Sequence, residues 1–526
     1  MKILYNAQIY SFDRSRPQSS VLVIDRDRVA AVGGAELLDA FGERTSREDI
    51  GGRVILPGLT DAHMHLMQYA LSLQKVDVET PTRAEALERV AKKAAETPPG
   101  QWIFGHGWQH NDWGGEFPFA SDLDAVAPAH PVYLTAKSLH ASWANTMALK
   151  LAGIGQDSQD PINGRISRDE GGLPDGILLE AAMELIEKIL PKPSAAEVAN
   201  AIRDALPNLW KFGLTGVHDF DYRTAFMALQ LLDISGQLNF RVTKSIPLEL
   251  LPHAQALGLR TGFGSAHLKI GSVKVFMDGA LGPHTAAMLQ PYLNEPENKG
   301  ILNIDGEQFF EYGRLAAESG LSMTAHAIGD RALHEVLNGL EQLRNYEREQ
   351  GLPRLRHRIE HVQIIHPDDA LRLGKLGIVA SMQPIHAISD MLTADKYWGE
   401  RVDLAYSWRT QLDAGASLAF GSDAPVETPN PFWGLHAAVT RRRADGYPGP
   451  QGWHPEQRLS MREALEGYTI GAAYAAGLED SLGRLSPGHY ADLIVLEKDP
   501  FTCPPDDLLQ IHSSATMLGG EWLWQE

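Results

Sequence analysis

Cysteine is almost absent from this sequence. Cys503 is the one cysteine among 526 residues, so neither a disulfide nor a thiolate metal cluster can form within the chain. It lies in a proline-rich turn near the end of the sequence, where we expect a small inert side chain. A disulfide-stabilised scaffold and a cysteine-based zinc site are therefore excluded.

Positive charge is also scarce. The 47 Lys and Arg residues are outnumbered by 67 Asp and Glu residues, which gives a formal net charge of −20. A surface with this excess of negative charge repels nucleic acid phosphates and anionic lipids. We therefore expect neither nucleic acid nor a membrane as a partner.

Long apolar segments are missing as well. No apolar run is long enough to span a bilayer, and Asn6, Gln8 and Asp13 interrupt the first apolar residues, so no signal peptide is predicted. Hydrophobic residues still make up 44% of the chain, enough for a large buried core. These features predict a cytoplasmic globular protein.

Both ends of the chain have the pattern of short strands. Residues 2–10 alternate apolar and polar side chains, and residues 20–32 hold two β-branched runs separated by a polar turn. Near the other end, residues 493–496 form a compact apolar run, and residues 513–525 a strand pair around two glycines. We predict one small β-sandwich domain built from residues 1–56 and 481–526.

The middle of the chain, residues 57–480, alternates apolar strands with helical stretches such as residues 83–96 and 194–210. This alternation is typical of parallel strands joined by helices and predicts an α/β fold, a (β/α)₈ TIM-type barrel. An insertion rich in Gly, Pro and Trp is expected around residues 100–190. Strands are predicted at 54–59, 213–220, 273–277, 321–326, 358–362, 377–383 and 417–420, with further candidates at 102–104, 132–135 and 240–246.

Two histidines follow the predicted strand 54–59. His63 and His65 are separated by one residue, and side chains at i and i+2 of a strand project to the same side. Neutral imidazole is a common zinc ligand, so both rings can bind one metal ion. Taken alone, the pair is equally consistent with two unrelated polar residues in a loop.

Similar side chains recur at the ends of later predicted strands. His326 follows residues 321–325, His361 follows 358–360, and Asp423 follows 418–422. A parallel barrel builds its active site at the carboxyl ends of its strands, so these groups are expected to converge. The recurrence in chain order favours a metal site over unrelated structural residues.

Lys274 requires a separate explanation. Strand alternation places it on the face opposite Val273 and Val275, and a lysine that points into a barrel is costly to bury unpaired. One remedy is an ion pair, for example with Asp278. The other is carboxylation by CO₂, which converts the amine into an anionic oxygen ligand.

The order of HxH, Lys, His, His and Asp on successive strands resembles the amidohydrolase superfamily, in particular its YtcJ-like branch, which includes N-substituted formamide deformylases. The resemblance covers nearly the whole chain. Its motifs are PGLTDAHMHL (57–66), GHGWQHNDW (105–113), VKVFMDGALG (273–282), AHAIGDRA (325–332), RIEHVQ (358–363), SMQPIHAISD (381–390), AFGSDAPVE (419–427) and GRLSPGHYADLIVLEKDPF (483–501).

The resemblance implies hydrolysis of an amide, N-formyl or N-acyl C–N bond by a metal-activated hydroxide. Asp423 is then the general base and afterwards the general acid. One or two divalent ions per chain, zinc by expectation, are implied, with Lys274 carboxylated and bridging. The expected metal ligands are His63, His65, Lys274, His326, His361 and Asp423.

Further residues are candidates for contacts with a small amide-type substrate. His140, a candidate catalytic residue, lies where relatives carry Asp-Gly-His, but this chain has Ser138-Leu139-His140, so substrate contacts there are expected to differ. Asp278 and His386 lie at predicted strand ends. Trp108 provides an aromatic surface for an apolar substrate group or, equally well, packs the core of the insertion.

Two other functions stay open at this level. A single metal held by His63, His65, His326 and Asp423 would suit deamination of a heterocycle. A catalytically inactive barrel would act as a binding or scaffold protein, although a scaffold has no need of a complete ligand set. Large barrels often form homodimers, and the sequence leaves that arrangement open together with the substrate.

Overall fold

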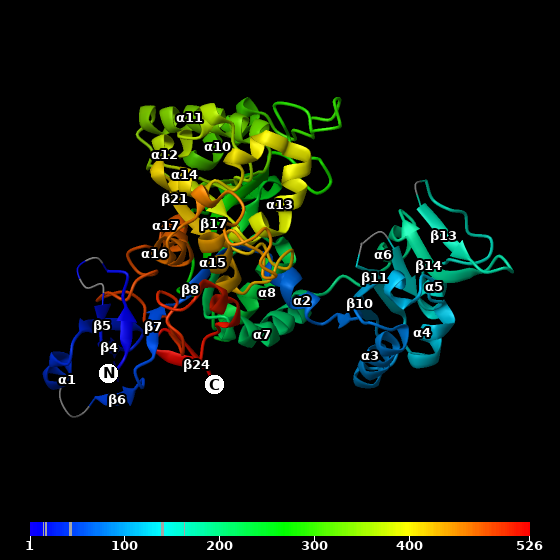
Figure 1. Cartoon of the computed structure of the whole chain (residues 1–526), viewed down its shortest axis with the longest axis horizontal. Helices are drawn as coiled ribbons and strands as arrows, with labels where there is room; N and C mark the ends of the chain where they lie inside the picture. Colours follow the sequence, from blue (N-terminus) through cyan, green and yellow to red (C-terminus); the bar gives the residue numbers. More distant parts are fainter. Residues whose placement is uncertain (14, 16–17, 42–44, 138–140, 163) are drawn as a thin grey trace. The chain divides into compact units, whose positions relative to one another are not determined.

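The computed structural model describes residues 1–13, 15, 18–41, 45–137, 141–162 and 164–526, which divide into two compact units (Figure 1). Unit 1 comprises Met1–Tyr69 and Val198–Glu526, and unit 2 comprises Ala70–Glu197. Within the described residues, every helix is too short or too polar to cross a membrane. Unit 1 combines both ends of the chain with the barrel, so the candidate ligands of the barrel lie within one unit.

Unit 1 contains a sheet of eight parallel strands in chain order. Each pairs with its neighbour in sequence, as helical crossovers dictate. The strands are β8 (Leu59–Met64), β15 (Leu214–Asp219), β16 (Arg241–Pro247), β17 (Leu268–Phe276), β18 (Met323–Ala327), β19 (Arg358–His361), β20 (Val379–Met382) and β21 (Ser417–Phe420). They confirm the predicted TIM-type barrel (Figure 1).

Several strand assignments from the sequence need correction. The predicted strand 54–59 is two strands: β7 (Val54–Pro57) belongs to the β-sandwich, whereas β8 starts the barrel and itself carries His63. The candidates 102–104 and 132–135 are β10 (Ile103–Trp108) and β11 (Val132–Ala136) of unit 2. Buried strands of different sheets share one apolar, β-branched composition, so the sequence pattern does not reveal which sheet a strand joins.

The barrel closes where the first strand meets the end of the last. The backbone N–H of Asp423 donates to the His63 carbonyl at 2.7 Å, and that of His65 donates to the Ala424 carbonyl at 2.9 Å. The buried Asp61 carboxylate accepts the Ser422 hydroxyl at 2.5 Å and the backbone N–H of His63 at 3.0 Å. At Gly421, a Cβ atom would come within 2.4 Å of the His63 nitrogen, so only glycine permits this approach.

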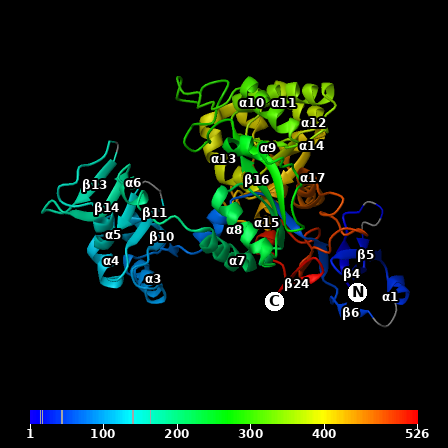
Figure 2. The same ribbon diagram turned by 180° about the vertical axis from the view of Figure 1, so that it is seen from behind.

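Helices surround the barrel sheet of unit 1 (Figure 2). The chain crosses the boundary between the units within α2 (Leu66–Ser72) and α7 (Ala195–Lys211). Helices α10 (Gly306–Glu318) and α11 (Asp330–Glu349) pack together because each presents an apolar face, and the Asp305 carboxylate caps α10. The α-helices that follow α7 are α8 (Arg223–Ile234), α9 (Leu251–Ala256), α10 (Gly306–Glu318), α11 (Asp330–Glu349), α12 (Arg372–Leu376), α13 (Pro384–Trp398), α14 (Trp408–Asp413), α15 (Pro431–Thr440), α16 (Met461–Glu466) and α17 (Ala472–Ala476).

The two chain ends form a β-sandwich, as predicted. One sheet has the order β5-β4-β1-β6 and the other β24-β23-β22-β7-β2-β3. Leu4 and Ile24 from the N-terminal part share a core with Leu493 and Met517 from the C-terminal part. The elements are β1 (Lys2–Tyr5), β2 (Gln8–Tyr10), β3 (Gln18–Ser19), β4 (Val21–Asp25), β5 (Arg28–Gly33), α1 (Glu36–Ala40), β6 (Ser46–Asp49), β7, β22 (Leu493–Leu496), β23 (Ala515–Leu518) and β24 (Glu521–Gln525).

Unit 2 has its own sheet and its own hydrophobic core. Six strands are ordered β13-β14-β12-β11-β10-β9, and the core includes Trp108 and Trp143. The segment 100–190, where the sequence predicts an insertion, lies within this unit. Its remaining elements are β9 (Val76–Asp77), α3 (Arg83–Glu96), α4 (Ala120–Val126), β12 (Ala141–Ala144), α5 (Thr146–Leu151), β13 (Gly164–Arg168), β14 (Pro174–Glu180) and α6 (Glu184–Glu187).

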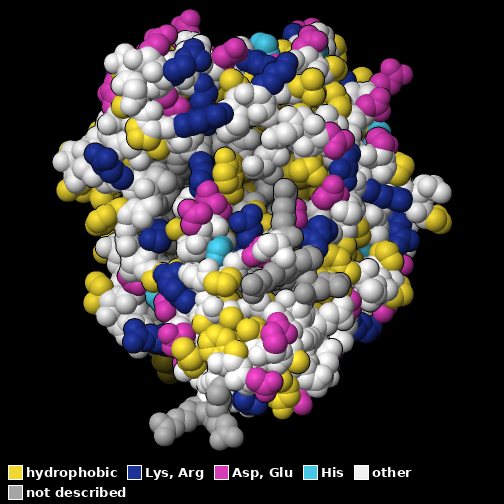
Figure 3. Space-filling model, turned by 90° about the vertical axis from the view of Figure 1, so that its left-hand side faces the viewer, with side chains coloured by type: hydrophobic (Ala, Val, Ile, Leu, Met, Phe, Trp, Pro, Cys, Tyr) yellow, Lys and Arg dark blue, Asp and Glu magenta, His cyan; other side chains and the backbone are white. Residues whose placement is uncertain are grey.

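Most surface charges contribute little to stability. On the face drawn in Figure 3, acidic and basic side chains are interspersed instead of forming a patch of one sign. Many are paired, for example Arg314 with Glu311 at 3.1 Å and with Glu318 at 2.8 Å. Solvent screens such exposed pairs, so each contributes at most about 1 kcal/mol.

The ion pair between Arg241 and Asp492, by contrast, is buried where the barrel meets the β-sandwich. The Arg241 guanidinium on β16 binds both carboxylate oxygens of Asp492, which precedes β22; the Nη2–Oδ1 distance is 2.8 Å. Both residues are less than 9% exposed, and the Tyr490 ring lies 3.8 Å from the guanidinium carbon. Removing one partner would leave the other charge buried and unpaired.

We predict that Arg241→Ala lowers the free energy of unfolding by about 3–5 kcal/mol, because the Asp492 carboxylate loses its partner in a buried position. Urea denaturation followed by tryptophan fluorescence measures this change. The matched control is Arg53→Ala, which breaks the 3.3 Å pair with the exposed Glu497 and should cost less than about 1 kcal/mol. Equal losses in the two variants would contradict a structural role for the buried pair.

Candidate metal centre

His63 is held in one orientation by a buried carboxylate. Its Nδ1 lies 2.5 Å from Glu360 Oε2, and both side chains are almost inaccessible to solvent. Its other ring nitrogen, Nε2, lies 3.5 Å from Asp423 Oδ1. A histidine whose Nδ1 is bound to a carboxylate presents Nε2 to a metal, which is the usual arrangement of metal-binding imidazoles.

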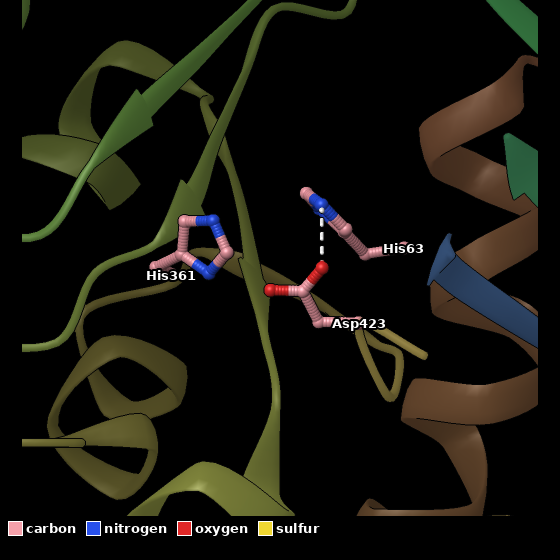
Figure 4. Close-up of side chains that lie close together, drawn as sticks. All are labelled: His63, His361 and Asp423. Atoms are coloured by element: carbon pink, nitrogen blue, oxygen red, sulfur yellow. Dashed lines mark ion pairs between the residues drawn. The ribbon is translucent and has the colours of Figure 1, made fainter. Parts of the chain in front are cut away.

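His361 and Asp423 meet His63 at the ends of strands β19, β21 and β8. One ligand atom from each of the three side chains lies within 4.8 Å of the other two (Figure 4). The Nδ1 of His361 is 2.8 Å from Gln383 Oε1, which leaves its Nε2 available. Among the described residues, this trio is the group of His, Cys, Asp and Glu side chains with the spacing of a metal site.

His65 and His326 flank the trio. His65 Nε2 is 3.5 Å from Asp423 Oδ1, and its Nδ1 is 3.4 Å from Asp221 Oδ1. His326 bonds the Gly279 carbonyl through Nε2 at 2.9 Å, so Nδ1 is its available nitrogen. The His361 ring lies 4.5 Å from that of His326 and 5.0 Å from that of His63.

Two of these residues adopt a backbone conformation that is uncommon outside glycine. The φ angle is 75° at His361 and 60° at Asp423, both in the left-handed region. Such conformations cost about 1–3 kcal/mol and cluster at functional sites, where the surrounding structure enforces them. The barrel-closing hydrogen bond of Asp423 to the His63 carbonyl provides that enforcement here.

Burial controls the protonation of the site. It lowers the pKa of His326 to about 3, and it lowers the pKa of His63 and His361 well below the usual value; nearby positive charge adds to each shift. These imidazoles are therefore neutral at physiological pH, the form that binds a metal. Burial raises the pKa of Asp423 to about 6, partly offset by His65 and Lys274. A neutral imidazole set with one carboxylate fits a divalent metal.

Lys274 on β17 is buried within this cluster of histidines. It is 5% exposed, and its Nζ lies 4.5 Å from the centre of the Phe220 ring and 5.0 Å from that of Phe276. Burial lowers the pKa of the amine to about 8, against the opposing influence of Glu360 and Asp423. The ion pair with Asp278 considered from the sequence does not form: that carboxylate accepts backbone N–H groups instead.

The residues that support the candidate ligands do not stand out in the sequence. Arg358 binds Glu360 Oε1 at 2.5 Å, His218 Nδ1 at 2.7 Å and the Ala62 carbonyl at 2.7 Å, so it joins strands β19, β15 and β8. Gln383 likewise orients His361 through its Nδ1 atom, and Asp221 lies beside Nδ1 of His65. The available signal was Arg358 and Glu360 themselves, two charged residues within a fully buried strand.

The predicted substrate-binding residues lie in different environments. Asp278 is buried and accepts three backbone N–H groups, from Ala287, Ile328 and Gly329, so it organises the loops beside His326. His386 on α13 points its Nε2 toward Asp423 Oδ2, 3.9 Å away, and burial lowers its pKa to about 4.

The two remaining candidates from the sequence are Trp108 and His140. Trp108 belongs to unit 2, where its side chain is completely buried and its indole N–H donates to the Leu134 carbonyl. This environment favours the packing role that the sequence left open. His140 lies outside the described residues.

Known proteins resemble this chain over nearly its full length. The sequence profile of the amidohydrolase family matches residues 48–523. The chain is 29% identical to the putative amidohydrolase YtcJ of Bacillus subtilis (strain 168), with 100% of this chain and 99% of that protein covered. It is 28% identical to the N-substituted formamide deformylase of Arthrobacter pascens, with 98% and 97% covered.

A solved structure has the same fold. The crystal structure of an uncharacterized metal-dependent hydrolase from Pyrococcus furiosus is 29% identical and superposes with a TM-score of 0.80, covering 95% of this chain and 100% of that one. The predicted superfamily, branch and enzyme class are thereby confirmed. The chain belongs to the amidohydrolase family and is a hydrolase.

Proposed function

We propose that this enzyme hydrolyses the C–N bond of a small amide, of the N-formyl or N-acyl class. The observation that carries the proposal is the cluster of His63, His361 and Asp423 at the carboxyl ends of three barrel strands. The similarity to a formamide deformylase over nearly the whole chain supports the choice of an amide. A set of two imidazoles and one carboxylate suits a divalent ion such as zinc and hydrolytic chemistry.

His63, His361 and Asp423 would hold the metal, with His65 and His326 beside them. A divalent ion at this position, zinc in our proposal, supplies Lewis acidity that polarises a carbonyl oxygen and lowers the pKa of water. Glu360 and Gln383 keep the Nδ1 atoms of two ligands occupied, so that both Nε2 atoms face the same point.

Asp423 is placed to transfer the proton. Its two carboxylate oxygens face different groups: Oδ1 lies near His63 and His65, and Oδ2 near His386. Its side chain is 13% exposed, so water reaches it. A carboxylate here can take a proton from the attacking water and return it to the leaving nitrogen, which departs readily only when protonated.

We further propose that Lys274 is carboxylated by CO₂. The amine adds to the carbon of CO₂ and loses a proton, which yields an anionic carbamate. The positive charge of Lys274 acts on His63, His326 and His361 alike, and this supports a position between the ligands. A carbamate would replace that positive charge by an oxygen ligand and permit a second metal ion.

The first prediction concerns metal content. We expect purified, zinc-reconstituted protein to retain at least one metal per chain, and His63→Ala and His361→Ala to lose it, because each removes a ligand. Glu360→Gln should weaken zinc affinity by about 10- to 100-fold, since it leaves His63 without its orienting carboxylate. Mass spectrometry of metals after dialysis measures both effects, and His334→Ala on the surface is the control.

The number of zinc ions bound per chain distinguishes a site with two metals from a site with one. Two zinc ions per chain, falling to one in Lys274→Ala, would support the carbamate-bridged pair. One zinc per chain irrespective of Lys274 would support the alternative of a mononuclear deaminase. Retention of full metal content in both His63→Ala and His361→Ala would contradict the proposed site.

The second prediction concerns the reaction. In a panel of N-formyl and N-acyl amines, the zinc-loaded enzyme should release amine from at least one compound. His63→Ala should abolish this activity, and Asp423→Asn should lower kcat by about 10²- to 10⁴-fold because the proton acceptor is lost. Asp413→Asn, an exposed carboxylate on α14, is the matched control. Activity at the full rate in His63→Ala would contradict the mechanism.

The third prediction concerns the carbamate. Protein equilibrated with ¹³C-bicarbonate should give a carbamate carbon signal in its ¹³C NMR spectrum. Lys274→Arg should lack the signal, because a guanidinium does not form the adduct, whereas Lys269→Arg on the same strand should retain it. A spectrum without a carbamate carbon in the zinc-loaded wild-type protein would refute carboxylation.

A further inference from the structure

Among the buried polar atoms that lack hydrogen-bond partners in the described part of the chain, three lie close together beside the proposed ligands. They are His386 Nε2, Gln363 Oε1 and Gln383 Nε2, at the end of β19 and the start of α13. A buried donor or acceptor without a partner costs about 1–3 kcal/mol, so native proteins keep few of them. Their occurrence together beside the proposed metal-binding side chains indicates a surface that binds a small molecule.

His386 is the one of the three that faces the reacting groups directly. Its Nε2 lies 3.9 Å from Asp423 Oδ2, too far for a hydrogen bond yet close enough for one ligand atom to contact both. Its ring lies parallel to that of His361, with the ring centres 6.1 Å apart and the planes inclined by 9°. The side chain is 9% exposed and its Nε2 atom is buried, so the surrounding residues hold the ring in place.

Gln363 contacts the other ring nitrogen of His386, Nδ1. The amide Nε2 of Gln363 donates to Nδ1 of His386 at 3.4 Å. An imidazole nitrogen that accepts a hydrogen bond is unprotonated, so the proton resides on Nε2. The Gln363 side chain is itself fixed by burial, and its backbone carbonyl accepts the Tyr406 N–H at 2.7 Å. His386 therefore presents an N–H donor to the site.

We propose that the Nε2–H of His386 donates a hydrogen bond to the substrate carbonyl oxygen as that oxygen gains negative charge, and that Gln363 positions the donor. This inference rests on the proposed amide hydrolysis. An oxyanion needs donors aimed at the position where charge develops, and a donor already held in a buried site loses little entropy when it acts. His386 is thus a catalytic residue, and Gln363 is a positioning residue that acts through it.

The first experiment examines the tautomer in the unmodified, zinc-loaded protein. Long-range ¹H–¹⁵N correlation of protein labelled with ¹⁵N-histidine distinguishes the two neutral tautomers, and the spectrum of His386→Leu assigns the His386 signals by their loss. We expect a neutral ring protonated at Nε2. A ring protonated at Nδ1 would overturn the proposal. In Gln363→Leu the preference should weaken toward a mixture, which a merely structural Gln363 would not produce.

The second experiment measures binding of acetohydroxamic acid, a metal-binding anion that carries a carbonyl oxygen, by calorimetry. Losing the donor in His386→Leu should weaken binding by roughly 10- to 100-fold, the effect of one hydrogen bond to a charged oxygen. His386→Gln should recover most of the affinity because its amide nitrogen can occupy the place of Nε2, whereas His386→Asn should not. His334→Gln, a surface change of the same kind, should bind as the wild type does.

Failure of this inference and failure of the proposed function give different results. If the wild type binds zinc and acetohydroxamate but His386→Leu binds the hydroxamate equally well, the role of His386 is refuted and the metal site stands. If the wild type binds no zinc, the proposed hydrolase mechanism fails, and the tautomer measured in the metal-free protein still decides the arrangement of Gln363 and His386.

Discussion

The hydrogen bonds that close the barrel between β8 and the end of β21 determine where the metal-binding groups lie. The Asp423 N–H to His63 carbonyl bond spans residues 360 positions apart and joins two of the three ligands directly. The absence of a side chain at Gly421 allows that approach, and the positive φ of Asp423 turns its carboxylate toward His63. Because closure and ligand placement depend on the same contacts, the site can form only when the barrel is complete.

A buried polar network then sets the properties of the ligands. Glu360 binds His63, and Arg358 holds Glu360 while it also reaches β15 and β8. Charges buried this deeply are costly unless they are paired, which explains why each has several partners. The same burial keeps the imidazoles neutral and brings the pKa of Asp423 to about 6, so the packing of the barrel interior produces the protonation states that metal binding requires.

Much of the arrangement of the candidate ligands could be predicted, because these residues recur at the carboxyl ends of successive strands. His326, His361 and Asp423 each lie at or just beyond the carboxyl end of a strand, and parallel strands all end at one rim, so their convergence followed from the pattern. The supporting residues were not predicted in the same way. Glu360 and Gln383 do not share a spacing with the histidines they orient, because a hydrogen bond across strands depends on register and rotamer. Strand 54–59 was misassigned because a change of sheet at Gly58 leaves no mark in hydrophobicity.

By itself, the sequence determined the class of fold and the family and nominated the candidate ligands, since periodic apolar strands and histidines at their ends are local features of the chain. Only the tertiary structure decided which ligands share a position, with His361 beside both His63 and His326, and which nitrogen of each ring is available. It also placed Trp108 in the core of a separate unit and His386 beside Asp423. The physical reason is that ligand geometry and hydrogen-bond direction arise from contacts between strands far apart in the chain, which exist only once those strands have packed together.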